Sequence, residues 1–251
     1  MKFDDISHEI FLARKDLRIS NVLKDTVFKD ININQAYSIQ KTVIELLGQN
    51  IAGWKIGGTN NLSQKIFKTT NQFWGPIFEN SLFQNSEYLT LKEGELELAF
   101  KFSEKIELLS SNDSINKSNL REYISSIAIA IEYPFSCVRR VNDPNLSALI
   151  SDCCASGQAL VSKEIKYKEN YDFGFIDFKI NSSLIERCSA KNLMKSCNNI
   201  ILNFINKSIK KNLALKGGQW LLTGGISPLI HFQKNSLIEI SSRDFEIVYC
   251  V

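Results

Sequence analysis

The sequence predicts an α+β protein built around a rolled or barrel-like sheet. Short strand candidates gather in the second half of the chain without regular alternation with helices. Residues 95–102, ELELAFKF, alternate with a period of two, whereas residues 34–47 repeat apolar side chains at helical spacing. No internal repeat or Pro- or Gly-rich linker divides the chain. We therefore expect one domain over residues 1–251, with a mainly helical segment at 1–50 and a β-roll region at 51–251.

Further local patterns predict the remaining elements. Gly48 follows the helix candidate at 34–47 as a C-terminal stop. Asn119 and Glu122 resemble a capping box, which predicts a second helix through about residue 128. A third helix is expected within 191–210, and the longest loop at 103–118. Strands are expected at 95–102, 127–133, 173–180, 183–187, 219–223, 236–240 and 245–250, with a hairpin turn at Asn181–Ser182.

Composition excludes several classes of protein. Lys and Arg number 30 against 27 Asp and Glu, and the net charge of +3 is too small for a nucleic-acid-binding surface. No stretch approaches the roughly 18 apolar residues of a membrane span. The 6 cysteines show no Cys-x-x-Cys pair, which is typical of reduced thiols. We expect a cytoplasmic protein without nucleic-acid or membrane partners.

The sequence offers few residues for nucleophilic or zinc chemistry. Its 2 histidines, His8 and His231, lie far apart and neither has a nearby Ser or Cys in a nucleophile setting. No Gly-x-Gly-x-x-Gly or Walker loop is present. The glycine pairs that begin at Gly57 and Gly224 predict tight turns, which can bring backbone amides close to a ligand.

Carboxylates are the remaining candidates. Glu95 and Glu97 lie on one face of the same predicted strand, where like charges are unfavourable unless a cation lies between them. A solvent-exposed strand face is the simpler explanation of that pair. Glu132, however, ends the apolar run IAIAI, where an unpaired buried acid would be costly. Three carboxylates would suit Mg²⁺ or Mn²⁺.

Lys55 is the candidate acid–base group. It lies in GWKIGG between Trp54 and Ile56, and partial desolvation there would make the amine a proton donor or acceptor. A surface lysine with a buried stem explains the same residues equally well.

Seven blocks of the chain resemble one family in order and approximate spacing. The blocks are AYSIQ (36–40), GWKIGGT (53–59), WGPIFENSLF (74–83), GELELAF (94–100), AIEYPFSCVRR (130–140), SDCCASG (151–157) and LKGGQWLLTGGISP (215–228). With these blocks, from about residue 34 to the end, the chain resembles the 2-keto-4-pentenoate hydratases and 4-oxalocrotonate decarboxylases of the fumarylacetoacetate hydrolase superfamily.

This resemblance implies a rolled β-sheet with helical cover, a Mg²⁺ or Mn²⁺ ion and a small-molecule 2-oxo acid substrate. It implies that Lys55 and Asp152 are catalytic. By motif, the metal ligands correspond to Glu95, Glu97 and Glu132, and the substrate-binding positions to Gly57, Ser156 and Thr223.

The expected reaction is hydration of a 2-hydroxy-2,4-dienoate to a 4-hydroxy-2-oxo acid. Decarboxylation of a 4-oxalocrotonate-like diacid is the alternative, and hydrolysis ranks lower because no His–carboxylate pair is apparent. Gln219 and Asn80 stand where the family usually has Asp, which favours a third possibility, a non-catalytic ligand-binding or partner subunit. We also expect a homo-oligomer, with association with a related enzyme as in the family's catabolic systems.

Overall fold

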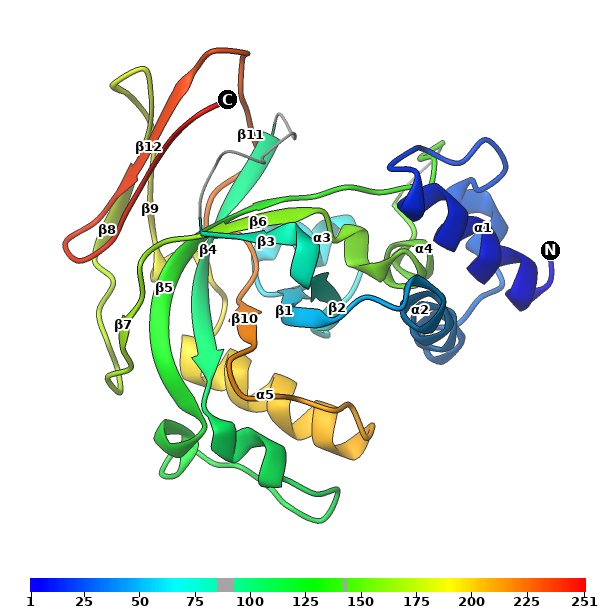
Figure 1. The fold of residues 1–251 in the computed structure, drawn as a ribbon, viewed down its shortest axis with the longest axis horizontal. Helices are drawn as coiled ribbons and strands as arrows, with labels where there is room; N and C mark the ends of the chain where they lie inside the picture. The colour runs from blue at the N-terminus through cyan, green and yellow to red at the C-terminus, as the bar shows by residue number, and fades with distance from the viewer. Residues whose placement is uncertain (85–92, 142–143) are drawn as a thin grey trace.

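The computed structural model describes residues 1–84, 93–141 and 144–251. Within these residues the strands form two sheets. One has nine strands, in the order β2-β1-β10-β4-β5-β6-β3, with β11 added to β4 and β7 to β5. The other has four strands, in the order β13-β12-β8-β9. The larger sheet curls into a half-barrel (Figure 1).

The elements follow one another in a mixed order. The helices are α1 (Phe3–Lys15), α2 (Ile33–Leu47), α3 (Asn61–Ile66), α4 (Leu146–Ser151) and α5 (Cys197–Lys210). The first strands are β1 (Ile51–Gly57), β2 (Phe73–Phe78), β3 (Leu82–Phe83), β4 (Glu93–Phe102), β5 (Ile124–Tyr133), β6 (Gln158–Val161) and β7 (Ile165–Lys166). The later strands are β8 (Phe175–Ile180), β9 (Ser183–Ser189), β10 (Trp220–Leu222), β11 (Ile230–His231), β12 (Leu237–Ser241) and β13 (Glu246–Cys250).

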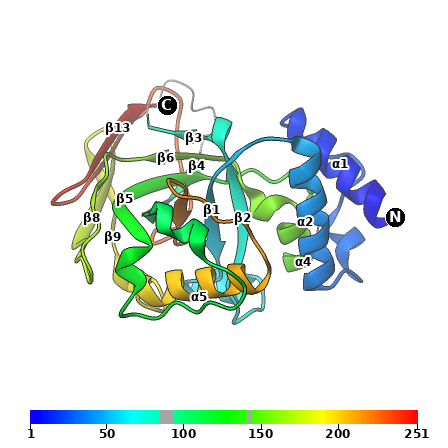
Figure 2. The same cartoon turned by 60° about the horizontal axis from the view of Figure 1, so that its bottom comes forward.

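Helices cover the larger sheet at two places. α1, α2 and α4 gather beside the β1–β2 edge, whereas α5 runs along another side of the curled sheet (Figures 1 and 2). Two hydrophobic clusters correspond to this arrangement, one joining α5 to both sheets and the other joining the N-terminal helices to α4 and β2.

None of the described helices is both long and apolar enough to cross a membrane.

Several predicted elements are confirmed. α2 ends at Gly48, which adopts the left-handed conformation with φ of 59°. Side chains of β4 alternate as the sequence indicates, with Leu96 and Leu98 in the core and the glutamates on the opposite face. Asn181 and Ser182 both have positive φ and join β8 to β9 in an antiparallel hairpin.

The helix predicted from Asn119 is wrong. Residues 120–122 form only a 3₁₀ turn, and β5 begins at Ile124. The Asn119 side chain accepts a hydrogen bond from the backbone of Asn116, at 2.9 Å, instead of capping a helix. The apolar residues that follow are used in pairing with β4 and β6, so tertiary contacts outweigh the local capping signal.

The third predicted helix begins later than expected. α5 starts at Cys197 because Ser196 serves as the N-cap, its hydroxyl accepting a hydrogen bond from the Asn199 amide. The predicted loop at 103–118 contains a 3₁₀ helix, Glu104–Leu108. Ile115 fixes this loop to α5 through two hydrogen bonds with the Asn206 side chain, at 2.9 and 2.8 Å.

Candidate active site

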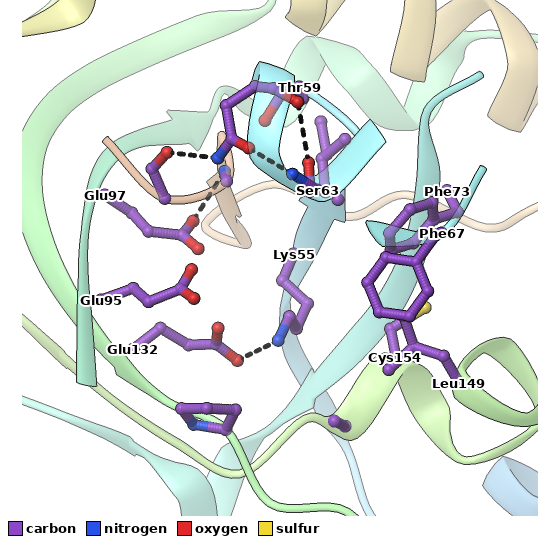
Figure 3. Close-up of a pocket in the computed structure, with 17 residues that line it drawn as sticks. Lys55, Thr59, Ser63, Phe67, Phe73, Glu95, Glu97, Glu132, Leu149 and Cys154 are labelled. Atoms are coloured by element: carbon purple, nitrogen blue, oxygen red, sulfur yellow. Dashed lines mark hydrogen bonds and ion pairs between the residues drawn. The ribbon is translucent and has the colours of Figure 1, made fainter. Parts of the chain in front are cut away.

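Strand register brings the three predicted carboxylates together. β4 and β5 pair antiparallel with Glu95 directly opposite Glu132, and Glu97 follows on the same face of β4. All three line one cavity of about 180 Å³ and their side chains point toward one another (Figure 3). Glu97 and Glu132 are only 1% and 3% exposed, so the explanation as a solvated strand face does not hold.

Lys55 lies across the same cavity, on β1. Its ammonium group donates a short hydrogen bond to Glu132 Oε1 (Figure 3). Its residue exposure is 8%, so it is not a surface lysine. Glu97 is held separately, because its Oε2 accepts a hydrogen bond from the Gly224 backbone amide at 2.8 Å. One buried cation therefore faces three acids.

The site is electrostatically unbalanced. Burial, followed by repulsion from Glu132, raises the pKa of Glu95 to about 7 and that of Glu97 well above its ordinary value. Burial also raises the pKa of Glu132, although Lys55 opposes the change. For Lys55, burial favours the neutral amine, but attraction to Glu132 and Glu97 outweighs it and raises the pKa. The carboxylates require more positive charge, or protons, than Lys55 alone supplies.

The donor set fits a hard divalent cation. Three carboxylates with surplus negative charge are the ligands that Mg²⁺ and Mn²⁺ prefer. As arranged in the described part of the chain, no group of three or more His, Cys, Asp or Glu side chains is placed to hold a metal ion. Two of the acids are instead engaged by Lys55 and the Gly224 amide. The metal centre therefore stays a prediction.

Glycines allow the loops to approach the acids. A Cβ on Gly225 would clash with the Glu95 carboxylate, and one on Gly57 would clash with the ring of Phe73. Gly57, which the resemblance implies is a substrate-binding position, lines the cavity. Asn60 joins the two loops by donating a hydrogen bond from Nδ2 to the Gly225 carbonyl, at 2.8 Å.

Thr59 is a candidate ligand-binding residue that the sequence reasoning missed. It lines the cavity, and its buried Oγ1 has no hydrogen-bond partner among the described residues. A buried unpaired hydroxyl is costly unless a ligand or water satisfies it. Its position directly after the glycines of the GWKIGGT block was the available signal.

The cavity has an apolar end. Phe67, Phe73 and Leu149 lie together, on the side of Lys55 away from the three glutamates (Figure 3). Within the described lining, Lys55 is the only positively charged side chain. The cavity therefore has one ionic end and one end suited to hydrocarbon.

Asp152, predicted to be catalytic, does not line this cavity. It is fully buried, and Arg14 Nε on α1 lies 2.6 Å from its Oδ1. Its Oδ2 accepts hydrogen bonds from Ser136 Oγ at 2.7 Å and the Cys137 amide at 2.8 Å. With both oxygens occupied by protein donors, this carboxylate holds the structure together and does not face the ligand space.

Two predicted substrate-binding residues also lie outside the lining. The Ser156 side chain is buried, and its carbonyl accepts a hydrogen bond from Arg14 at 2.8 Å. Thr223 is fully buried behind Gly224, with its backbone amide bonded to Leu98. Among the residues described, neither side chain is part of the cavity wall.

The departures from the family pattern, Gln219 and Asn80, do not line the cavity either. Gln219 accepts a hydrogen bond from the Trp54 indole at 3.3 Å and donates one to the Ile51 carbonyl at 2.9 Å, so it has a structural role. Asn80 is exposed in a 3₁₀ turn. These substitutions leave the ionic end of the cavity intact.

The histidines do not reach the cavity. His231 Nδ1 lies 2.9 Å from Glu93 Oε2, but this pair is largely exposed, and His8 lies on α1. Neither histidine lines the carboxylate cavity. A histidine-activated water inside it has no support among the described residues.

A scan against protein-family models finds no match, and no curated protein matches by sequence. Solved structures do match. 4-Oxalocrotonate decarboxylase from Pseudomonas putida G7, complexed with magnesium and adipate, superposes with a TM-score of 0.81 at 13% identity, covering 97% of this chain and 95% of that one. Fumarylacetoacetate hydrolase from the psychrophile Exiguobacterium antarcticum gives a TM-score of 0.54 at 11% identity, over 81% of this chain and 75% of that one.

A third match is 5-carboxymethyl-2-hydroxymuconate delta-isomerase from Mycobacterium smegmatis, with a TM-score of 0.51 at 10% identity over 80% and 79% of the two chains. These likenesses show the fold. The predicted α+β, fumarylacetoacetate hydrolase-like rolled sheet is confirmed.

Proposed function

We propose that the chain is a metal-dependent lyase of the fumarylacetoacetate hydrolase superfamily that hydrates a short, unsaturated 2-oxo acid. The observation that carries this proposal is the meeting of Glu95, Glu97 and Glu132 in one buried cavity with Lys55. The solved structure with magnesium is of a decarboxylase with this fold, which is consistent with a divalent cation here.

The three glutamates would hold the cation. When bound, Mg²⁺ or Mn²⁺ would polarise the 2-oxo group and stabilise the negative charge that develops on its oxygen. Thr59 Oγ1, buried without a partner among the described residues, is suited to hydrogen-bond a substrate oxygen.

Lys55 would move the proton between the enol oxygen and carbon. It is protonated while the acids around it are charged, because Glu132 and Glu97 raise its pKa. Neutralising those acids would leave burial as the main influence and lower the pKa toward the range useful for proton transfer. Once the C3–C4 alkene is conjugated to the 2-oxo group, water adds at C4.

The apolar end of the cavity favours hydration over decarboxylation. The substrate of a 4-oxalocrotonate decarboxylase is a diacid, and its second carboxylate would need a cation or several donors when buried. Phe67, Phe73 and Leu149 line that end, and the Asn60 amide and Ser63 hydroxyl, also in the lining, already donate hydrogen bonds to backbone carbonyls. A monoacid such as 2-hydroxypenta-2,4-dienoate fits this lining better.

Loss of the ultraviolet absorbance of 2-hydroxypenta-2,4-dienoate, followed with and without Mg²⁺, tests the proposal. We expect Mg²⁺-dependent turnover, reduced by about 10²–10⁴-fold in Lys55→Met because proton transfer is lost. Lys101→Met is the matched control, since Lys101 pairs with Glu164 outside the cavity. No turnover by the wild type would contradict the lyase assignment, and faster decarboxylation of 4-oxalocrotonate would contradict the monoacid assignment.

A further inference from the structure

A second cavity lies outside the carboxylate site, between the N-terminal helices and the end of α5. Its volume is about 330 Å³. Tyr37 and Trp74 form an aromatic floor, with their ring centroids 4.9 Å apart, and apolar side chains of α2 and α4 extend it. Figures 1 and 2 show the C-terminal end of α5 on the side where α2 and α4 lie. The rim is formed by Lys207, Lys210 and Lys211.

A smaller polar cavity of about 70 Å³ adjoins this one. Lys207, Asn71 and Gln72 line both cavities, so the two lie side by side. Lys195 and Asn203 complete the polar part. Among the described lining residues of the two cavities there is no Asp or Glu. We call the combined feature, with its lysines 195, 207, 210 and 211, the lysine groove.

The lysine groove is unusual in a chain whose charges nearly cancel. The sequence holds 27 acids for 30 Lys and Arg, yet none of the four groove lysines forms an ion pair with a carboxylate in the described part of the chain. Lys211 instead lies over the two aromatic rings, with Nζ 4.6 Å from the Tyr37 centroid and 5.8 Å from the Trp74 centroid. Burial, followed by repulsion from Lys195 and Lys211, lowers the pKa of Lys207.

Interaction with the helix dipole explains only part of this cluster. Lysines near the C-terminal end of α5 are favoured by its partial negative charge. Lys195 precedes the N-terminal end, where the dipole disfavours a cation, and it still lines the groove beside Lys207. A bound anion would relieve the repulsion that Lys207 experiences from Lys195 and Lys211.

We propose that the lysine groove binds a small molecule that carries two neighbouring negative groups on an apolar or aromatic body, an organic diphosphate being the fitting class. One negative group would lie between Lys195 and Lys207, where side-chain amides can also donate hydrogen bonds. The other would meet the amines of the last turn of α5. The apolar body would pack on the floor formed by Tyr37 and Trp74.

The groove shares walls with the carboxylate cavity but does not depend on the function proposed for it. Thr59 lines both the polar cavity and the carboxylate cavity, and Phe73 lines both the aromatic floor and the carboxylate cavity. The charged residues of the groove are nevertheless different from those of the carboxylate cavity, so ligand binding to the groove can be tested without any turnover assay.

Isothermal calorimetry with ADP, pyrophosphate and adenosine at constant ionic strength tests the inference. The buffer contains a chelator, so that no metal ion bridges ADP to the glutamates. We expect saturable binding of ADP, weaker binding of pyrophosphate, which lacks the ring, and no binding of adenosine. Lys207→Met and Lys211→Met should each weaken ADP binding by about tenfold through loss of one charge-assisted contact.

Lys117→Met provides the matched control, because Lys117 is an exposed lysine outside the groove. Absence of saturable ADP binding by the wild type would overturn the proposal. So would equal affinities of the groove variants and the control, because binding would then be non-specific attraction to surface charge. Equal affinities for pyrophosphate and ADP would overturn the role of the aromatic floor.

Discussion

At the residue scale, the main feature of this protein is a buried excess of negative charge. Three glutamates face one lysine in a single cavity, and Glu97, Glu132 and Lys55 are buried there. Glu132 is held by Lys55 and Glu97 by a backbone amide, whereas Glu95 has no hydrogen-bond donor among the described residues. Burying these like charges together is unfavourable in free energy unless protons or a cation neutralise them.

Glu97→Gln should abolish metal binding and leave the fold intact, because an amide cannot supply the negative charge that the cation needs. Its carbonyl oxygen can still accept the hydrogen bond from Gly224, so the local structure is retained. Calorimetric titration with Mn²⁺, with circular dichroism to check folding, measures both effects. Glu164→Gln serves as control, since Glu164 lies outside the cavity. Retained tight binding by Glu97→Gln would rule out this residue as a ligand.

The raised pKa of Glu95 predicts a pH-dependent stability. The pKa is about 7 in the fold against an ordinary 4.5, mainly through burial. The folded state thus holds this proton more tightly than the unfolded chain, so the stabilisation is complete below about pH 4.5 and is lost as the pH rises through about 7. In a buffer that contains a chelator, the melting temperature of the wild type should fall more steeply from about pH 4.5 to about pH 7 than the melting temperature of Glu95→Gln. Parallel pH profiles would show that Glu95 titrates normally.

Sequence reasoning at this scale succeeded where the signal was local. Glu95 and Glu97 could be placed on one face from their spacing, whereas the apolar neighbours of Lys55 fitted a buried amine and a surface lysine equally well. Asp152 could not be interpreted this way, because its partner Arg14 lies 138 positions earlier in the chain. A motif gives the position of a carboxylate, but only the packed structure gives its partners.

At the element scale, α1 braces the segment that forms part of the cavity wall. Cys153, Cys154 and Ala155 all have positive φ, of 50°, 55° and 54°, which non-glycine residues adopt only at a cost. Arg14 donates hydrogen bonds to the Asp152 carboxylate and to the Ser156 carbonyl, on either side of this segment. Cys154 and Ala155 line the cavity, so the helix supports the site from behind.

Arg14→Met should therefore destabilise the protein by about 3–5 kcal/mol, because it leaves the buried Asp152 charge unpaired. Urea unfolding followed by circular dichroism measures the change. Arg18→Met is the matched control, since Arg18 is a more exposed residue of the same region that pairs with Glu9 at 3.2 Å. That control should change stability by about 0–1 kcal/mol. Similar losses for the two variants would show that α1 does not brace the segment.

The predicted elements differ in how well local sequence determined them. α2 was predictable because periodicity and its glycine stop agree, and the β8–β9 hairpin because Asn tolerates positive φ. The start of β5 was not predictable from the local sequence. The capping pattern at Asn119 favours a helix, but the residues that follow pair with β4 and β6 instead. Competition between local and long-range contacts cannot be judged from a short window of sequence.

At the scale of the whole molecule, the curled sheet is what assembles the site. β1 and β4 are separated by one strand, β10, which comes from near the end of the chain. Lys55 and the glutamates therefore lie on strands that are not neighbours, and the curl of the sheet lets them face one another across the cavity (Figure 3). The sequence blocks indicated this fold through their order, whereas the lysine groove, made from distant segments, left no sequence motif. The expected homo-oligomer and the association with a related enzyme stay predictions.

A crystal structure of the protein with Mn²⁺ and oxalate, using the anomalous signal of manganese, tests the central claim most directly. We predict one ion coordinated by Glu95, Glu97 and Glu132 at about 2.1 Å, as is usual for small hard cations. Oxalate, which mimics the carboxylate and 2-oxo oxygens, should complete the coordination within reach of Lys55. Manganese elsewhere, or no anomalous peak among the three glutamates at saturating Mn²⁺, would contradict the account.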